Sequence, residues 1–226
     1  MRIAHLAALV VSLLLAACAN QSRQGMAAPQ GEGLCAWPMG EGNGCNWTCD
    51  NRGAYRWTVR GRQDYQVRKD LGLDTATVTM EVDVTVLNGE AAKPGGAGFG
   101  IGCLSRRGGI TNPGRTHNGY LGLVKTNGAW AIMKYVHITL TGEDKFIQLT
   151  GTNEPGTIGP IQATNRIGIT CSSEQGIGPT VVSLSLNGQG VKTVTDSDEN
   201  FNRFFGATLW VSSLPGDLVF ERFNVR

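Results

Sequence analysis

Residues 75–86 read TATVTMEVDVTV and alternate between polar and apolar side chains throughout. Successive side chains of a β-strand point to opposite faces, so this pattern would place the valines on one face and the threonines and acids on the other. A helix would spread the apolar residues around its axis. Twelve residues would span about 40 Å at roughly 3.3 Å each, so the pattern predicts a central strand of a large sheet with one buried face.

Short segments with β character continue from Asn51 to the C-terminus, and they are separated by Gly, Asn, Asp and Pro. Asn-Gly pairs at 127–128 and 187–188 predict hairpin turns, because both residues tolerate positive φ. The glycine-rich run at 97–104 predicts a strand that a neighbour approaches closely, or a bulge. We therefore predict an all-β fold, an antiparallel two-sheet sandwich, although a single closed sheet would give the same turn spacing.

The N-terminal segment has the anatomy of a secretory signal, with Arg2 followed by an apolar stretch that is too short to span a membrane comfortably. It closes with Leu-Ala-Ala-Cys at residues 15–18, which resembles the lipobox of bacterial lipoproteins. The resemblance implies cleavage before Cys18, lipidation of that residue and a palmitate-type membrane anchor. An ordinary cleaved signal with an incidental cysteine is the alternative. In either case we expect an extracytoplasmic location.

These features divide the chain into a signal peptide at 1–17, a lipidated cysteine and flexible tether at 18–33, and a sandwich domain at 34–226. The signal contains one basic residue, which leaves 19 Lys and Arg against 18 Asp and Glu. A net charge of +1 gives no reason to expect nucleic acid as a partner. We expect no cofactor and no metal.

The remaining cysteines predict disulfides, because an exported domain folds in an oxidising compartment. Cys103 and Cys171 each end an apolar run that a strand would bury, so we predict that they pair. Cys35 would pair with Cys49 or Cys45, and the sequence does not choose between them. A three-thiolate metal site in this segment would lack the paired C-x₂-C spacing of known zinc sites.

A family resemblance appears in the order of the segments TVTMEVDVTV, GFGIGC, NGYLGLVKTNGAWAIMKY, NRIGITC, VSLSLNGQGV and GDLVFERFNV. This order resembles the concanavalin A-like lectin/glucanase superfamily of jelly rolls, near its laminin-G-like members. The resemblance covers about Tyr55 to Arg226. It implies a jelly-roll sandwich but leaves the activity open, because one fold hosts many functions.

The glucanases of that superfamily carry a Glu-x-Asp-x-Glu strand, in which the resemblance implies a nucleophile, a tuning acid and an acid/base. Glu81 and Asp83 match the first two positions, but the third is Thr85, or Val86 in the longer form of the motif. A retaining glycosidase needs two carboxyls roughly 5–5.5 Å apart. We therefore expect no catalysis here, and we expect Glu81 and Asp83 to be polar-face residues paired with nearby arginines.

The functional prediction is a membrane-anchored lipoprotein whose sandwich binds carbohydrate or another cell-envelope component. An aromatic ring flanked by hydrogen-bonding groups suits a sugar ring, so the candidate ligand residues are Glu81, Asp83, Trp57 and Trp130. The alternatives are an envelope domain that binds protein and has no sugar site, and a divergent glycoside hydrolase. The acidic run at 196–199 could hold Ca²⁺, but it lacks an EF-hand pattern and is more typical of a solvated loop.

Overall fold

The computed structural model describes residues 34–37, 45–50, 53–61, 63–105, 118–138, 143–152, 164–198 and 201–226. One compact unit spans Gly33–Arg226. The predicted signal peptide and tether, including Cys18, lie outside the described residues. Among the described residues, no helix has the length and apolar character needed to cross a membrane.

The described residues form thirteen strands and three short 3₁₀ helices. The strands are β1 (Cys45–Cys49), β2 (Tyr55–Val59), β3 (Gln63–Thr75), β4 (Thr77–Val86), β5 (Ala97–Ser105), β6 (Asn118–Lys125), β7 (Trp130–Ile138), β8 (Glu143–Thr152), β9 (Thr164–Ser173), β10 (Thr180–Leu186), β11 (Gln189–Asp196), β12 (Phe204–Ser213) and β13 (Gly216–Val225). The 3₁₀ helices are η1 (Leu34–Ala36), η2 (Glu90–Ala92) and η3 (Glu174–Gly176).

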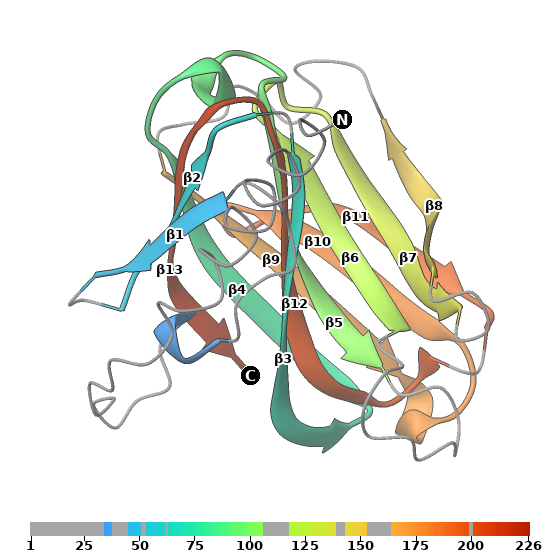
Figure 1. Ribbon diagram of the computed structural model, residues 1–226. Coiled ribbons are helices and arrows are strands. Elements are labelled where there is room, and N and C mark those ends of the chain that lie inside the picture. The colour runs from blue at the N-terminus through green and yellow to red at the C-terminus, as the bar shows by residue number, and fades with distance from the viewer. Residues whose placement is uncertain are drawn as a thin grey trace, which may run out of the picture. The chain divides into compact units, whose positions relative to one another are not determined.

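The strands form two sheets, and every pairing between neighbouring strands is antiparallel. The seven-stranded sheet has the order β1-β2-β13-β4-β9-β10-β11, and the six-stranded sheet has the order β3-β12-β5-β6-β7-β8. In Figure 1, β9, β10 and β11 lie behind β5, β6 and β7. The predicted two-sheet antiparallel sandwich is confirmed.

The alternation that predicted a central strand produces β4, the middle strand of the seven-stranded sheet. Its side chains Val78, Met80, Val82 and Val84 are 0–1% exposed and belong to the core between the sheets. One detail of the prediction was wrong. The segment is not a single strand from residue 75, because the chain bends at Ala76, where it leaves the six-stranded sheet and enters the other.

A disulfide joins the two sheets through the core. Cys103 on β5 pairs with Cys171 on β9, and both residues are fully buried. Cys35 pairs with Cys49 and so links η1 to β1. The predicted long-range pair is therefore confirmed, and of the two pairings left open for Cys35 the structure has the one with Cys49.

Both Asn-Gly pairs lie in the predicted hairpins. Between β10 and β11, Asn187 and Gly188 have φ values of 53° and 78°, the left-handed pair that a two-residue turn of this kind needs. Between β6 and β7 only Gly128 is left-handed, with φ of 85°, and its N–H donates to the Lys125 carbonyl at 2.8 Å. The Lys125 N–H also donates to the Ala129 carbonyl at 2.8 Å, so residues 126–128 form a three-residue loop that ends in glycine.

Glycine occupies alternate positions of β5, at residues 98, 100 and 102, while Phe99, Ile101 and Cys103 between them face the core. The glycines therefore face away from the other sheet. A Cβ at Gly102 would lie 2.4 Å from the Tyr120 carbonyl oxygen and 2.7 Å from Thr208 Cγ2. A neighbour does approach this strand closely, as predicted, and the strand presents little side-chain bulk on its outer side.

We predict that Gly102→Ala and Gly98→Ala will differ in their effect on stability. The new methyl group at residue 102 would clash with backbone, so the free energy of unfolding should fall by about 1–3 kcal/mol. At residue 98 the nearest atoms would be 3.5 Å away, at ordinary contact distance, so the change should stay within about 0.5 kcal/mol. Urea denaturation of both variants measures the difference, and equal losses would contradict it.

Candidate functional site

Glu81 and Asp83 both project from the outer face of β4, as their spacing predicted, and arginines engage both. The Asp83 carboxylate is 2% exposed and accepts hydrogen bonds from Arg166 at 2.7 and 3.2 Å, and Arg222 pairs with it at 2.5 Å. Arg226 binds Glu81 at 2.6 Å. The hydrogen bond to Asp83, followed by its charge, raises the pKa of Arg166.

The conformation of β13 provides one of these arginines. A register shift in its pairing with β4 falls between Glu221 and Asn224, and Arg222 has a φ of 52° within it. A left-handed conformation costs energy for a residue with a Cβ, so the surrounding contacts must maintain it. The ion pair with Asp83 is such a contact. The predicted pairing of these acids with nearby arginines is therefore what the structure has.

The other polar residues of β4 are paired with β9 in the same way. Hydroxyl–hydroxyl hydrogen bonds join Thr77 to Ser172, Thr79 to Thr170 and Thr85 to Thr164, at distances of 2.7, 3.0 and 2.8 Å. Thr85 stands where a glucanase strand would carry its third acid. This face therefore offers side chains that already bind one another, and it has no acid at the position where a leaving group would need a proton.

Trp57 does not lie at a surface where a ligand could reach it, and its proposed role as a ligand residue was wrong. Its side chain is 3% exposed, and its ring packs 5.3 Å from Phe220 and 5.7 Å from Tyr55, measured between ring centroids. The reason is its place on β2, where Tyr55, Trp57 and Val59 form the buried half of an alternating strand. A ring in this position contributes to packing and presents no face to a sugar.

The outer face of the six-stranded sheet has a different character, because it is concave. The Arg68 guanidinium on β3 lies 4.8 Å from the centroid of the Tyr135 ring on β7, although β12, β5 and β6 separate these strands. Strands about 4.8 Å apart would place β3 and β7 roughly 19 Å apart in a flat sheet. Two side chains can bridge that gap only where the sheet curves around them.

Hydrogen bonds fix this bridge in place. Arg68 donates to the Gln66 side chain at 2.7 Å, and Gln66 donates to the Thr208 hydroxyl at 3.1 Å. Thr208 and Leu121, which face outward between the bridging residues, are 2% and 1% exposed. These side chains therefore fill the middle of the concave face and leave no space there for a ligand.

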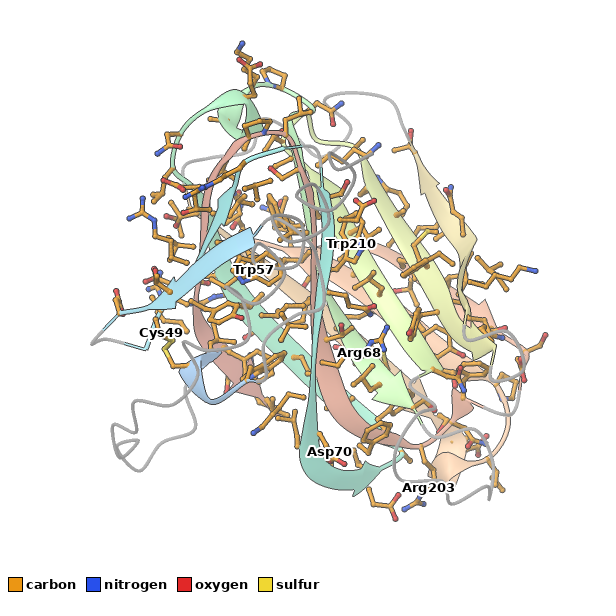
Figure 2. The ribbon with its side chains drawn as sticks, viewed as in Figure 1. Cys49, Trp57, Arg68, Asp70, Arg203 and Trp210 are labelled. Atoms are coloured by element: carbon orange, nitrogen blue, oxygen red, sulfur yellow. A yellow bond between two sulfur atoms is a disulfide. The ribbon has the colours of Figure 1, made fainter. Side chains whose placement is uncertain are left out.

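Beside this bridge the concave face is hollowed around Trp210. Figure 2 labels Trp210, Arg68 and Asp70 along β3 and β12, with Trp57 apart from them near β2. Two adjoining cavities of about 250 and 50 Å³ share Gly98, Lys125 and Trp210, and we call them together the Trp210 hollow. The larger is also lined by Gly95, Gly96, Ser212, Ser213 and Leu214, and the smaller by Leu123, Val124, Trp130, Ala131 and Thr152.

The rim of the Trp210 hollow is held by hydrogen bonds between segments distant in sequence. The Thr126 hydroxyl donates to the Lys93 carbonyl at 2.8 Å and accepts from the Ala97 N–H at 3.2 Å. The Leu214 N–H donates to the Gly96 carbonyl at 2.8 Å. A rim that is already ordered loses little conformational entropy when a ligand binds.

The structure brings together only part of the predicted site. Trp130 lines the smaller cavity of the Trp210 hollow and packs partly against the core, whereas Glu81 and Asp83 lie on the other sheet. Sequence reasoning missed Trp210. The signal was available, because residues 207–212 read ATLWVS, and the tryptophan stands in phase with Thr208 and Ser212 rather than with the apolar positions.

Asp196 and Asp198 of the acidic run form an ionic cluster with Lys134, and Glu199 lies outside the described residues. The Lys134 ammonium lies 2.7 Å from carboxylate oxygens of both Asp196 and Asp198 and 4.3 Å from the centroid of the Phe201 ring. Tyr120 donates to Asp196 at 2.8 Å; burial, followed by this hydrogen bond, raises the pKa of Tyr120 well above its ordinary value. Among the described residues no cluster of three or more His, Cys, Asp or Glu could hold a metal ion.

Comparison with known proteins identifies the fold. No protein-family model and no curated protein sequence matches the chain. Among solved structures, the potassium-bound carbohydrate recognition domain of Emp46p matches 85% of this chain and 88% of its own, with a TM-score of 0.51 and 10% identity. A legume lectin-like domain from Entamoeba histolytica matches 81% of this chain and 87% of its own, with the same score and identity.

A third structure, the carbohydrate-binding module CBM66 from Bacillus subtilis, matches 80% of this chain and 91% of its own, at 18% identity and a TM-score of 0.47. The fold assignment rests on the first two. At 10% identity they show that this chain has the sandwich fold of lectin-type domains, in agreement with the jelly-roll prediction.

We predict that Asp83 stabilises the fold. Replacing it by alanine removes a buried carboxylate and leaves two arginines without their shared partner, so the free energy of unfolding should fall by about 1–3 kcal/mol. Asp74→Ala is the matched control, because it breaks an ion pair with Arg203 between two exposed side chains and should have a much smaller effect. Thermal or urea unfolding compares them, and an unchanged stability of the Asp83 variant would refute this role.

Proposed function

We propose that this chain is a non-catalytic carbohydrate-binding lipoprotein of the bacterial cell envelope, and that the Trp210 hollow is its sugar site. The observation that carries the proposal is the half-buried Trp210 ring in a hollow on the concave face. Ser212, Lys125 and the backbone of Gly95 and Gly96 line the same hollow. An apolar ring face surrounded by hydrogen-bonding groups matches the two kinds of surface that a sugar ring presents.

The volume of the hollow suits a single sugar ring. The larger cavity, of about 250 Å³, lies just below the range of roughly 300–1,000 Å³ that is typical of small-molecule sites. The Arg68–Tyr135 bridge closes the middle of the face beside it. We infer that one sugar ring binds deeply, against Trp210, and that the rest of a longer glycan stays outside.

The comparisons are compatible with this proposal. Two domains of the same fold are described as a carbohydrate recognition domain and a legume lectin-like domain. The ion pairs of Glu81 and Asp83 favour binding over hydrolysis. Arg226 pairs with Glu81, and Arg166 and Arg222 pair with Asp83, so both carboxylates are already engaged. Neither acid lines the Trp210 hollow.

The first test is binding. We expect the purified domain to bind a subset of glycans on an array, and we expect Trp210→Ala to weaken that binding by about tenfold or more, because a central aromatic anchor carries much of the affinity of a small site. Gly98→Val is a second variant, because its side chain would enter the hollow next to Trp210 from a position with room for a Cβ. Isothermal titration measures both.

Asp83→Ala is the control for this test, since Asp83 lies on the other sheet. It should keep the wild-type affinity at a temperature where the variant remains folded. Loss of binding in Asp83→Ala, with normal binding in Trp210→Ala and Gly98→Val, would place the sugar site on the seven-stranded sheet and refute the proposal.

The lipid anchor forms a separate part of the proposal and rests on the Leu-Ala-Ala-Cys motif at 15–18. We expect the full-length chain, expressed in a bacterium, to incorporate a labelled fatty acid and to fractionate with membranes. Cys18→Ala should abolish both. Membrane fractionation without label, or label that persists in the variant, would contradict lipidation at this residue.

A second candidate function is binding to another envelope protein. The observation in its favour is the exposure of two apolar side chains close in sequence, Ile177 after η3 and Val181 on β10, which are 67% and 39% exposed. A glycan array without signal, together with a partner whose capture is lost in an Ile177→Asp variant, would favour this function over sugar binding.

A further inference from the structure

Lys125 is the charged side chain of the Trp210 hollow. It is the last residue of β6, its side chain is exposed, and it lines both cavities. Neither lining includes an aspartate or a glutamate. Among the described residues no carboxylate pairs with its ammonium group, so no described acid compensates this positive charge at the hollow.

Seven of the thirteen lysines and arginines among the described residues form an ion pair with a described acid, and Lys125 is not one of them. Arg56, Arg166, Arg222 and Arg226 each have an aspartate or glutamate partner. The contrast is sharpest with Lys134, on the neighbouring strand β7, whose ammonium is buried between two aspartates. Lys134 therefore has two acidic partners, whereas the exposed Lys125 has none among the described residues and remains available to a ligand.

The position of Lys125 relative to Trp210 defines how a ligand could use it. An added Cβ at Gly98 would lie 3.5 Å from Lys125 Cγ and 3.5 Å from Trp210 Cζ3. The lysine stem and the indole ring therefore flank Gly98, whose backbone forms the floor between them. A sugar ring that stacks on Trp210 would have its substituents within reach of the flexible lysine stem.

Two acids of the described residues bear on this charge: Glu90, beside Gly96 at the rim, is paired with Lys93 at 2.6 Å, and Asp64 lies on the same face of the sheet. Asp64 on β3 pairs in register with Ser212, which pairs with Gly98, which pairs with Lys125. Three strand spacings separate the two backbones, and the curvature of the sheet shortens the distance between their side chains. Asp64 lines neither cavity of the Trp210 hollow, and among the described residues no ion pair joins it to Lys125.

We propose that the Trp210 hollow selects glycans that carry an anionic group, and that Lys125 is the specificity residue that binds it. This inference rests on the proposed sugar-binding function. A lysine ammonium is a point charge with rotatable donors, so it accepts either the carboxylate of a uronic acid or a sulfate ester. The shared chemistry is therefore a sugar with a fixed negative charge near the ring that stacks on Trp210.

The experiment compares matched pairs of oligosaccharides that differ only in charge. One arm uses a panel of hexuronate hexasaccharides and their carboxyl-reduced counterparts, and the other uses a sulfated oligosaccharide panel and its desulfated counterparts. In at least one of the two panels, we expect the purified domain to bind the charged oligosaccharide about fivefold more tightly than its uncharged counterpart. Lys125→Met should remove this preference and leave the affinity for the uncharged member unchanged.

Lys192→Met is the control variant. Lys192 is exposed on β11 of the other sheet, so its loss changes the net charge equally but should preserve the preference. Raising the NaCl concentration from 20 to 300 mM should weaken wild-type binding of the charged member only. The arm that shows the preference identifies the anion as carboxylate or sulfate.

The outcomes separate this inference from the function on which it rests. If charged and uncharged members bind equally, and Trp210→Ala weakens both, the anionic preference is refuted and the sugar site stands. If Lys125→Met and Lys192→Met lower the affinity for the charged member equally, the attraction is not specific to the hollow, and the inference fails. If no member of any pair binds but other glycans on the array do, the anionic preference fails and the sugar site stands; if no glycan on the array binds either, both proposals fail.

Discussion

Burial of alternate side chains between the two sheets is the interaction on which the rest of the structure depends. β4 contributes Val82 and Val84 from one side, and β5 contributes Phe99 and Ile101 from the other, all without measurable exposure. The disulfide between Cys103 and Cys171 joins the same two layers. Because side chains alternate along a strand, burying one half of each strand turns the other half outward. The outer faces are therefore a consequence of the core.

The two outer faces differ in what occupies these outward positions. On the seven-stranded sheet, threonine hydroxyls pair across strands, and arginines bind Glu81 and Asp83, so the polar groups satisfy one another. On the six-stranded sheet, β5 has glycine at its outward positions, and the sheet is concave enough for Arg68 and Tyr135 to meet across three strands. At Gly98 the missing side chain leaves room beside Trp210, and that room makes a ligand site possible.

The sequence predicted the fold better than the site because the two depend on different kinds of information. The strand at residues 77–86, the hairpins at both Asn-Gly pairs and the partners Cys103 and Cys171 follow from local patterns of polarity, turn chemistry and expected burial. Trp57 was misassigned although its strand alternates Tyr55, Trp57 and Val59 with the polar Arg56 and Thr58, a pattern that favours burial of the tryptophan. Trp210 was missed because its importance depends on glycine at residue 98 of another strand.

The sequence by itself determined that the chain forms alternating strands, that one side of each is buried, and that glycines occupy every second position of one of them. These are local properties, set by the two-residue period of a strand and by the turns between strands. Only the tertiary structure decided the strand order within each sheet and the curvature that brings Arg68 to Tyr135. It also decided that Asp83 lies between two arginines, whereas Lys125 faces an open hollow. The reason is that whether a charge is neutralised depends on residues that are distant in sequence and adjacent only after the sheets pack.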